Sequence, residues 1–133
     1  MDMIAESAPF HLSFCVADFA QTRAFYVGVL GCPEGHSTLT YVDFFFYGNQ
    51  LTCHVAPERV RPVSKAGLDG NHFGVILAPQ AFDSLAAKLQ AAEISFLVAP
   101  ETQHAGEPGE RRKMIFADPS GNAIEIKSYG AAH

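Results

Sequence analysis

The hexapeptide HLSFCV at residues 11–16 has a counterpart in HFGVIL at residues 72–77. Each begins with a histidine and continues as a short apolar run, which is typical of a half-buried or buried strand. A predicted helix follows each of them, from Asp18 to about Leu30 in the first case and over residues 79–93 in the second. A shift of 61 residues superimposes the two patterns. An internal repeat of this kind indicates two related halves.

The remainder of each half is predicted to form strands. Residues 40–55, TYVDFFFYGNQLTCHV, are β-branched and aromatic and are interrupted at Gly48-Asn49, a typical hairpin turn. In the second half, a short strand at 94–98 precedes a hairpin at 113–127 that turns at residues 118–122. The polar stretch 99–112 between them is predicted to be a long loop, of the kind that often serves as a lid. We therefore expect one domain over residues 1–133, with a first module at 9–55, a linker at 56–71 and a second module at 72–128.

Composition narrows the classes of function. The chain of 133 residues is 48% apolar and has a net charge of −5, which disfavours nucleic acid and acidic membranes as partners. No apolar run is long enough for a membrane span, and residues 1–10 lack the pattern of a secretion signal. The cysteines at positions 15, 32 and 53 have no metal-binding spacing. We interpret them as free thiols of a cytoplasmic protein.

Three residues are candidates for a metal site. In AIEIK (123–127), strand alternation places Glu125 on the face opposite Ile124 and Ile126. His11 and His72 begin equivalent strands, so they can converge across a pseudo-twofold axis. Two imidazoles and one carboxylate form the facial triad that leaves open positions on Fe(II) or Mn(II). The alternative is that both histidines are structural and that Glu125 lies on a solvated face.

Three segments of the chain resemble the vicinal oxygen chelate superfamily of glyoxalases, bleomycin resistance proteins and extradiol dioxygenases. They are PFHLSFCVADFAQTRAFYVGVLG (9–31), NHFGVIL (71–77) and FADPSGNAIEIK (116–127), and the DP-x-GN turn before an alternating strand is the most specific. The resemblance implies an α+β fold in which two βαβββ modules form a cupped, eight-stranded mixed sheet with the helices outside. It also implies that His11, His72 and Glu125 occupy three ligand positions around a central metal ion.

A fourth ligand is common in this superfamily. Superposing the two hairpins at their glycine–asparagine turns places Thr52 opposite Glu125, and threonine is a poor substitute for a carboxylate ligand. His54 is two residues further along, about 7 Å away on the same face. His54 is therefore either a fourth ligand or an acid–base group beside a three-ligand metal. The second role resembles that of the non-ligand histidine of extradiol dioxygenases.

Other segments resemble a small group of predicted extradiol-type dioxygenases: GCPEG (31–35), DFFFYGNQLTCHVAPE (43–58) and GEPGE (106–110). This resemblance implies an oxidoreductase, a non-haem Fe(II) dioxygenase acting on a small molecule with adjacent oxygens. However, no tyrosine occurs between Tyr47 and Tyr129, where ring-cleaving enzymes usually carry one. Two alternatives therefore stay open. One is a glyoxalase-like isomerase or lyase, or an antibiotic-modifying enzyme, using Ni, Zn or Mn. The other is a non-enzymatic protein that binds small molecules of the bleomycin type.

Residues that contact the substrate are also predicted. Arg111, with its basic neighbours, is expected to attract an anionic substrate. His104 is expected to enter the site when the 99–112 loop closes, and Thr52 is expected to line the site. We expect a homodimer. The sequence leaves open whether the two modules pair within one chain or across two chains.

Overall fold

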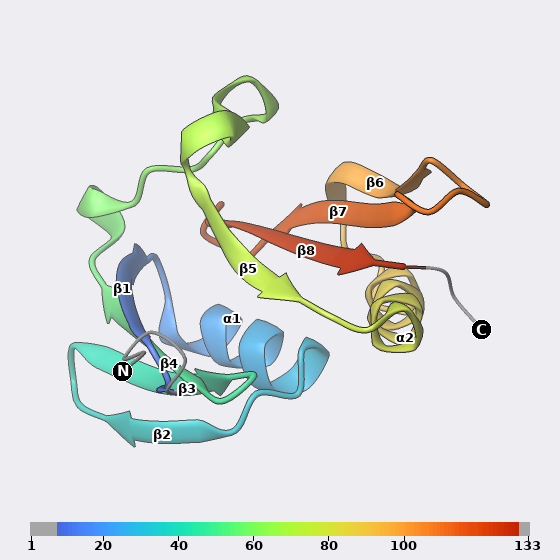
Figure 1. Ribbon diagram of the computed structural model, residues 1–133. Helices are drawn as coiled ribbons and strands as arrows, with labels where there is room; N and C mark the ends of the chain where they lie inside the picture. Colours follow the sequence, from blue (N-terminus) through green and yellow to red (C-terminus); the bar gives the residue numbers. More distant parts are fainter. Residues whose placement is uncertain (1–7, 131–133) are drawn as a thin grey trace, which may run out of the picture.

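The computed structural model describes residues 8–130, which form two units with the same order of elements (Figure 1). The first contains β1 (His11–Val16), α1 (Phe19–Arg23), η1 (Ala24–Val29), β2 (Glu34–Ser37), β3 (Tyr41–Phe46) and β4 (Asn49–Val55). The second contains β5 (His72–Ile76), α2 (Pro79–Ala91), β6 (Phe96–Gln103), β7 (Arg111–Ala117) and β8 (Ala123–Tyr129). The predicted α+β class and the two βαβββ modules are confirmed.

The strands form two separate sheets rather than one eight-stranded sheet in the described part of the chain. Their orders are β1-β4-β3-β2 and β5-β8-β7-β6, with a parallel pair at β1–β4 and another at β5–β8. The edge strands β1 and β5 approach each other through side chains, since the rings of Phe14 and Phe73 lie 5.4 Å apart. The expected cup is therefore not closed by backbone hydrogen bonds between β1 and β5.

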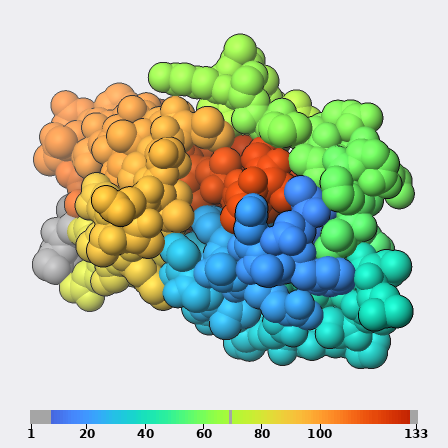
Figure 2. Space-filling model, turned by 180° about the vertical axis from the view of Figure 1, so that it is seen from behind, coloured from blue at the N-terminus to red at the C-terminus, as the bar shows by residue number. Residues whose placement is uncertain are grey.

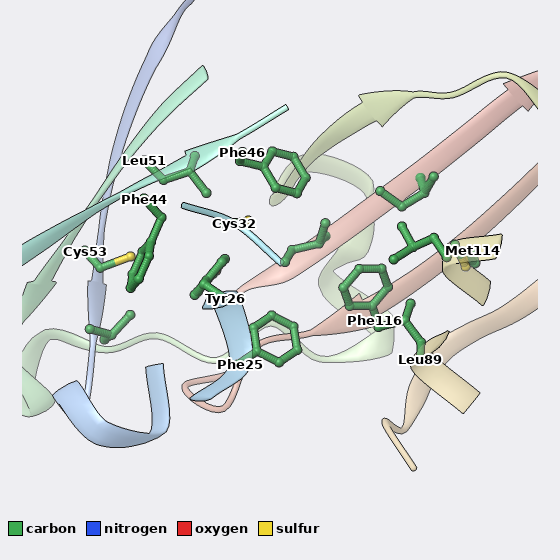
Figure 3. Close-up of a cluster of buried hydrophobic side chains, with 14 of the residues drawn as sticks. Phe25, Tyr26, Cys32, Phe44, Phe46, Leu51, Cys53, Leu89, Met114 and Phe116 are labelled. Atoms are coloured by element: carbon green, nitrogen blue, oxygen red, sulfur yellow. The ribbon is translucent and has the colours of Figure 1, made fainter. Parts of the chain in front are cut away.

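The first helix lies between the two sheets, whereas the sequence led us to expect it outside (Figure 1). Tyr26 stacks on Phe44 of the first sheet at 5.1 Å, and Phe25 lies 6.2 Å from Phe116 of the second. Figure 3 shows these aromatic rings within one shared core. Two adjacent aromatic side chains thus pack in different directions, and this helix buries two faces. Helix α2 packs on the second sheet through residues such as Leu89, which also belongs to the shared core.

The predicted helix after Asp18 has the expected limits but two geometries. The Asp18 carboxylate accepts a hydrogen bond from the Gln21 backbone at 2.7 Å and so caps the first turn. From Ala24 onward the helix is of the π type, as in the bond from the Leu30 amide to the Phe25 carbonyl. Gly31, at a φ of 76°, ends it, as predicted.

The polar stretch 99–112 is mostly strand, which corrects the prediction of a long loop. Strand β6 continues to Gln103 and β7 begins at Arg111, so the connection comprises only residues 104–110. Glu101 pairs with Lys113 across the two strands, and Gln103 pairs with Arg111. These polar cross-strand pairs extend the hairpin past Pro100, which lies where the register of β6 is irregular between Val98 and Glu101.

The segment between the modules packs on the turn of the last hairpin. It contains two short 3₁₀ helices, η2 (Pro57–Arg59) and η3 (Lys65–Gly70). The Val63 amide donates to the Gly121 carbonyl at 2.9 Å, and a Cβ on Gly121 would lie 2.6 Å from Pro62. Seen from behind, the red C-terminal hairpin is enclosed between the green linker and the blue first module (Figure 2).

None of the described helices is long and apolar enough to span a membrane. Residues 1–7, on which most of the argument against a secretion signal rested, lie outside the described residues.

Candidate metal centre

Strand alternation gives each sheet one core face and one outer face. On β1, the side chains of Leu12, Phe14 and Val16 belong to the core, so His11 points to the other side. On β8, the same argument turns Glu125 outward. We call the two surfaces the first and second outer faces. The first carries His11, Thr52, His54, Tyr41 and Asp43, and the second carries His72, Glu125, Lys127, Tyr129, Arg111 and Lys113.

His72 and Glu125 come together on the second outer face. Nε2 of His72 lies 3.7 Å from Oε1 of Glu125, and the two side chains are 29% and 11% exposed. On the other side of the ring, Nδ1 contacts the carbonyl of Leu68 in η3. Because a carbonyl only accepts, Nδ1 donates to it, and Nε2 is the ring nitrogen that faces Glu125. A metal-binding imidazole is commonly oriented in this way, by a backbone carbonyl that accepts from its other ring nitrogen.

The pair fits a divalent ion. Two ligand atoms about 2.1 Å from one ion lie roughly 3–4 Å apart, and the observed separation of 3.7 Å falls within this span.

Gly74 stands opposite Glu125 on β5, where a Cβ would lie only 1.5 Å from the Glu125 carbonyl oxygen. The absence of a side chain at Gly74 thus lets β5 approach β8 beside the carboxylate.

His11 is not part of this pair within one chain. It is exposed at the start of β1, opposite Gln50 of β4, on the first outer face. Among the residues described, no three histidine, cysteine, aspartate or glutamate side chains gather as a group that could hold a metal ion. Because the shared core lies between the two sheets, one chain presents His72 with Glu125 on one side and His11 on another.

The superposition of the two hairpins correctly makes Thr52 the equivalent of Glu125, but it does not predict the carboxylate of Asp43 beside Thr52. Thr52 lies opposite Ser13 on β1, as Glu125 lies opposite Gly74 on β5. The Thr52 hydroxyl donates to Asp43 Oδ1 at 2.6 Å, and both residues are buried. The first module therefore carries its carboxylate one strand away, on β3. The only sequence signal was alternation in YVDFFF, which turns Asp43 away from its apolar neighbours.

The predicted acid–base histidine is also on the first outer face. His54 lies between Cys15 of β1 and Tyr41 of β3 in the strand register. Its ring centroid is 5.7 Å from that of Tyr41, which is in turn 5.9 Å from His36. Within one chain, His54 thus accompanies His11 and Thr52 rather than Glu125.

Of the two predicted substrate contacts near the last hairpin, the structure brings one close to Glu125. Arg111 and Glu125 line the same cavity of about 170 Å³. His104 instead begins the 104–110 connection at a φ of 57°, is exposed, and lies 3.5 Å from Glu107. A wider groove of about 670 Å³ runs along β5 on the other side of Glu125 and contains His72.

The chain is a paired βαβββ protein that carries an oriented histidine–carboxylate pair on an outer sheet face. It belongs to the Glyoxalase/Bleomycin resistance protein/Dioxygenase superfamily, whose family model matches residues 8–126. The resemblance seen in the sequence is thereby confirmed.

Individual relatives are distant in sequence and similar in fold. Virulence protein STM3117 of Salmonella typhimurium is 24% identical over 119 residues, which are 90% of this chain and 82% of that protein. A glyoxalase/bleomycin resistance protein/dioxygenase from Alicyclobacillus acidocaldarius has a TM-score of 0.81 at 28% identity, over 97% of this chain and 96% of its own. The fosfomycin resistance protein FosX of Listeria monocytogenes has a TM-score of 0.73 at 18% identity, over 96% of each chain.

Proposed function

We propose that this protein is a metal-dependent enzyme acting on a small molecule with two adjacent oxygens. In this proposal His72 and Glu125 hold a divalent ion together with His11 of a second copy of the chain. The observation that carries it is the His72–Glu125 pair, with Nδ1 fixed by the Leu68 carbonyl and Nε2 directed at the carboxylate. An imidazole oriented in this way beside a carboxylate is arranged as a ligand pair.

The second copy follows from the separation of the two outer faces. One chain supplies two of the three ligands on its second outer face, and its own His11 points elsewhere. A homodimer that sets the first outer face of one copy against the second outer face of the other would complete two sites. His54 and Thr52 would then enter each site with His11, because all three lie on the first outer face.

The chain's own residues have distinct roles in this proposal. The bound ion would act as a Lewis acid on two adjacent substrate oxygens. Glu125 offsets the charge of that ion, and the two histidines set its geometry. His54 would transfer protons to and from the substrate. Thr52, held by Asp43, would position the substrate through its hydroxyl.

Fe(II)-dependent dioxygenation is the first candidate reaction, because two histidines and one carboxylate form the donor set of such enzymes. The second candidate is isomerase, lyase or antibiotic-modifying chemistry with Mn, Ni or Zn. This second candidate is favoured because β7 carries no tyrosine, although extradiol enzymes usually have one on that strand. Ile115 lies opposite Glu125 instead. A binding protein without activity is disfavoured by the oriented metal-ligand pair. The free thiols support a cytoplasmic location.

Elemental analysis tests the proposal. Protein purified without oxygen or chelators is compared with Glu125→Ala and with the matched surface variant Glu93→Ala. We expect about one metal ion per chain in the parent and in Glu93→Ala, and loss of that metal in Glu125→Ala. Iron would direct the search to oxygen uptake, whereas manganese, zinc or nickel would direct it to the second reaction class. Absence of metal after reconstitution, or full retention in Glu125→Ala, would overturn the assignment.

A further inference from the structure

The second outer face carries a cluster of positively charged side chains that has no role in holding a metal ion. Lys113 and Lys127 stand directly opposite each other on β7 and β8, and Arg111 is two residues from Lys113 on the same face. Like charges directly opposite each other destabilise a sheet. All three side chains line the 170 Å³ cavity that also contains Glu125 and Tyr129. This arrangement has a stability cost that binding of an anion would relieve.

The nearby acids neutralise this cluster only in part. Lys113 Nζ lies 3.6 Å from Glu101, and Lys127 Nζ lies 3.5 Å from Glu125. The Arg111 guanidinium donates to the amide oxygen of Gln103 at 3.0 Å, which aligns the side chain without offsetting its charge. If Glu125 serves a metal ion, its charge is no longer available to Lys127. At least two of the three cations are then free to bind an anion.

Arg112 also lines this cavity but is committed elsewhere. Its guanidinium bonds Asp83 of α2 at 2.8 Å, and its side chain is only 14% exposed. It therefore anchors the helix to β7. The cations directed at the cavity come from alternate positions of the strands, as expected for residues that share one face.

We propose that Arg111, Lys113 and Lys127 bind an oxyanion of the substrate, a phosphate, phosphonate or carboxylate group. The proposal rests on the proposed function in placing this group on the same molecule that the metal chelates. Lys127 follows Glu125 by two residues on the same face and its Nζ lies 3.5 Å from Glu125 Oε1, so the oxyanion would lie close beside the metal ligand. The substrate class is thus a small organic acid whose anionic group lies close to its two adjacent oxygens. The cavity of about 170 Å³ fits such a group rather than a large cofactor.

Calorimetric titration of the full-length protein with inorganic phosphate, and separately with acetate, tests this site. We expect Lys113→Gln and Lys127→Gln each to weaken binding of the preferred anion by about 10-fold or more. Lys65→Gln, which removes the same charge from the exposed start of η3, should leave the affinity unchanged. Preference for phosphate identifies a phosphate or phosphonate substrate, and preference for acetate identifies a carboxylate.

Glu125→Gln separates this inference from the metal assignment. This variant frees Lys127 from its acidic partner, so metal-free Glu125→Gln should bind the anion several-fold more tightly than the metal-free parent. Anion binding that depends on Lys113 and Lys127 in a protein that takes up no metal would support the anion site and overturn the proposed function. Metal binding without anion binding, or an equal loss of affinity in Lys65→Gln, would overturn the anion site alone.

Discussion

The hydroxyl of Tyr26 in the first module donates a hydrogen bond of 2.8 Å to Asp118 Oδ2 at the last turn of the second module. Both residues are buried. The same carboxylate accepts the backbone amides of Ser120 and Asn122, each at 2.9 Å. Ser120 and Asn122 in turn bond Ala17 and Cys15 of the first module. The sequence motif DPSGN therefore joins the modules, and its role is structural rather than catalytic.

The Tyr26→Phe substitution tests this junction. It leaves a buried carboxylate with one hydrogen-bond donor fewer, so we expect a loss of about 1–3 kcal/mol in the free energy of unfolding. Urea denaturation followed by circular dichroism measures it. Tyr47→Phe, at a side chain that is half exposed, is the matched control and should change stability by less than about 0.5 kcal/mol. Equal effects at the two tyrosines would show that the Tyr26–Asp118 bond does not stabilise the fold.

The same tyrosine should make the protein sensitive to alkali. Burial, and secondly the charge of Asp118, raise the pKa of Tyr26 well above its ordinary value of 10.0. The folded state therefore keeps a proton that the unfolded chain loses, and this contribution to stability is complete below pH 10 and falls above it. Relative to Tyr26→Phe, the parent should lose about 1.4 kcal/mol per pH unit above pH 10. Urea denaturation of both proteins between pH 8 and 11 measures the difference, and parallel curves would contradict it.

The three thiols should differ in reactivity. Burial raises the pKa of Cys32 from 9.0 to about 11 and raises that of Cys53 further, so little thiolate forms at either residue near pH 8. Cys15 is only partly buried. We expect one thiol per native chain to react quickly with a disulfide reagent at pH 8, and three in denaturant. Cys15→Ser should abolish the fast reaction, and a fast reaction that persists in this variant would refute the assignment.

Local patterns in the sequence were sufficient to predict the modules and the outward orientation of Glu125. They depend on alternation, on the cap at Asp18 and on the glycine at 31, which act over a few residues. The relative placement of the modules was not predictable in this way. It depends on Phe25 and Tyr26 packing against different sheets, a choice that helical periodicity does not specify. His11 and His72 therefore lie on different outer faces of one chain, an arrangement that the sequence left open beside their convergence within a chain.

Asp43 shows a second limit of the sequence. The comparison of the two hairpins looked for a carboxylate at Thr52, because that position is equivalent to Glu125. The carboxylate is instead on the adjacent strand, within hydrogen-bond distance of the Thr52 hydroxyl. Neighbours across a sheet are set by register, which a pattern within one strand does not reveal.

Gly74 should be necessary for the position of Glu125. A Cβ at Gly74 would overlap the Glu125 carbonyl oxygen, so Gly74→Ala must push β5 away from β8. We expect a loss of about 3 kcal/mol or more in stability and reduced metal content. Gly28→Ala is the control, because a Cβ there would meet nothing within 4 Å. Thermal denaturation and elemental analysis measure the two effects, and a Gly74→Ala protein with parental stability would contradict the close approach of the strands.

Mixing two inactive variants should restore metal binding if the site is shared between chains. His11→Ala lacks the ligand on the first outer face, and Glu125→Ala lacks one on the second. In a mixed dimer, the Glu125→Ala chain still supplies His11, and the His11→Ala chain still supplies His72 and Glu125, so one of the two sites is intact. We expect the co-expressed, doubly tagged heterodimer to bind about half the metal of the parent, and each homodimer to bind little. If both ligand sets instead served a site within one chain, every chain of the mixture would be defective. The heterodimer would then bind no more metal than either variant alone, and the proposal of a shared site would fail.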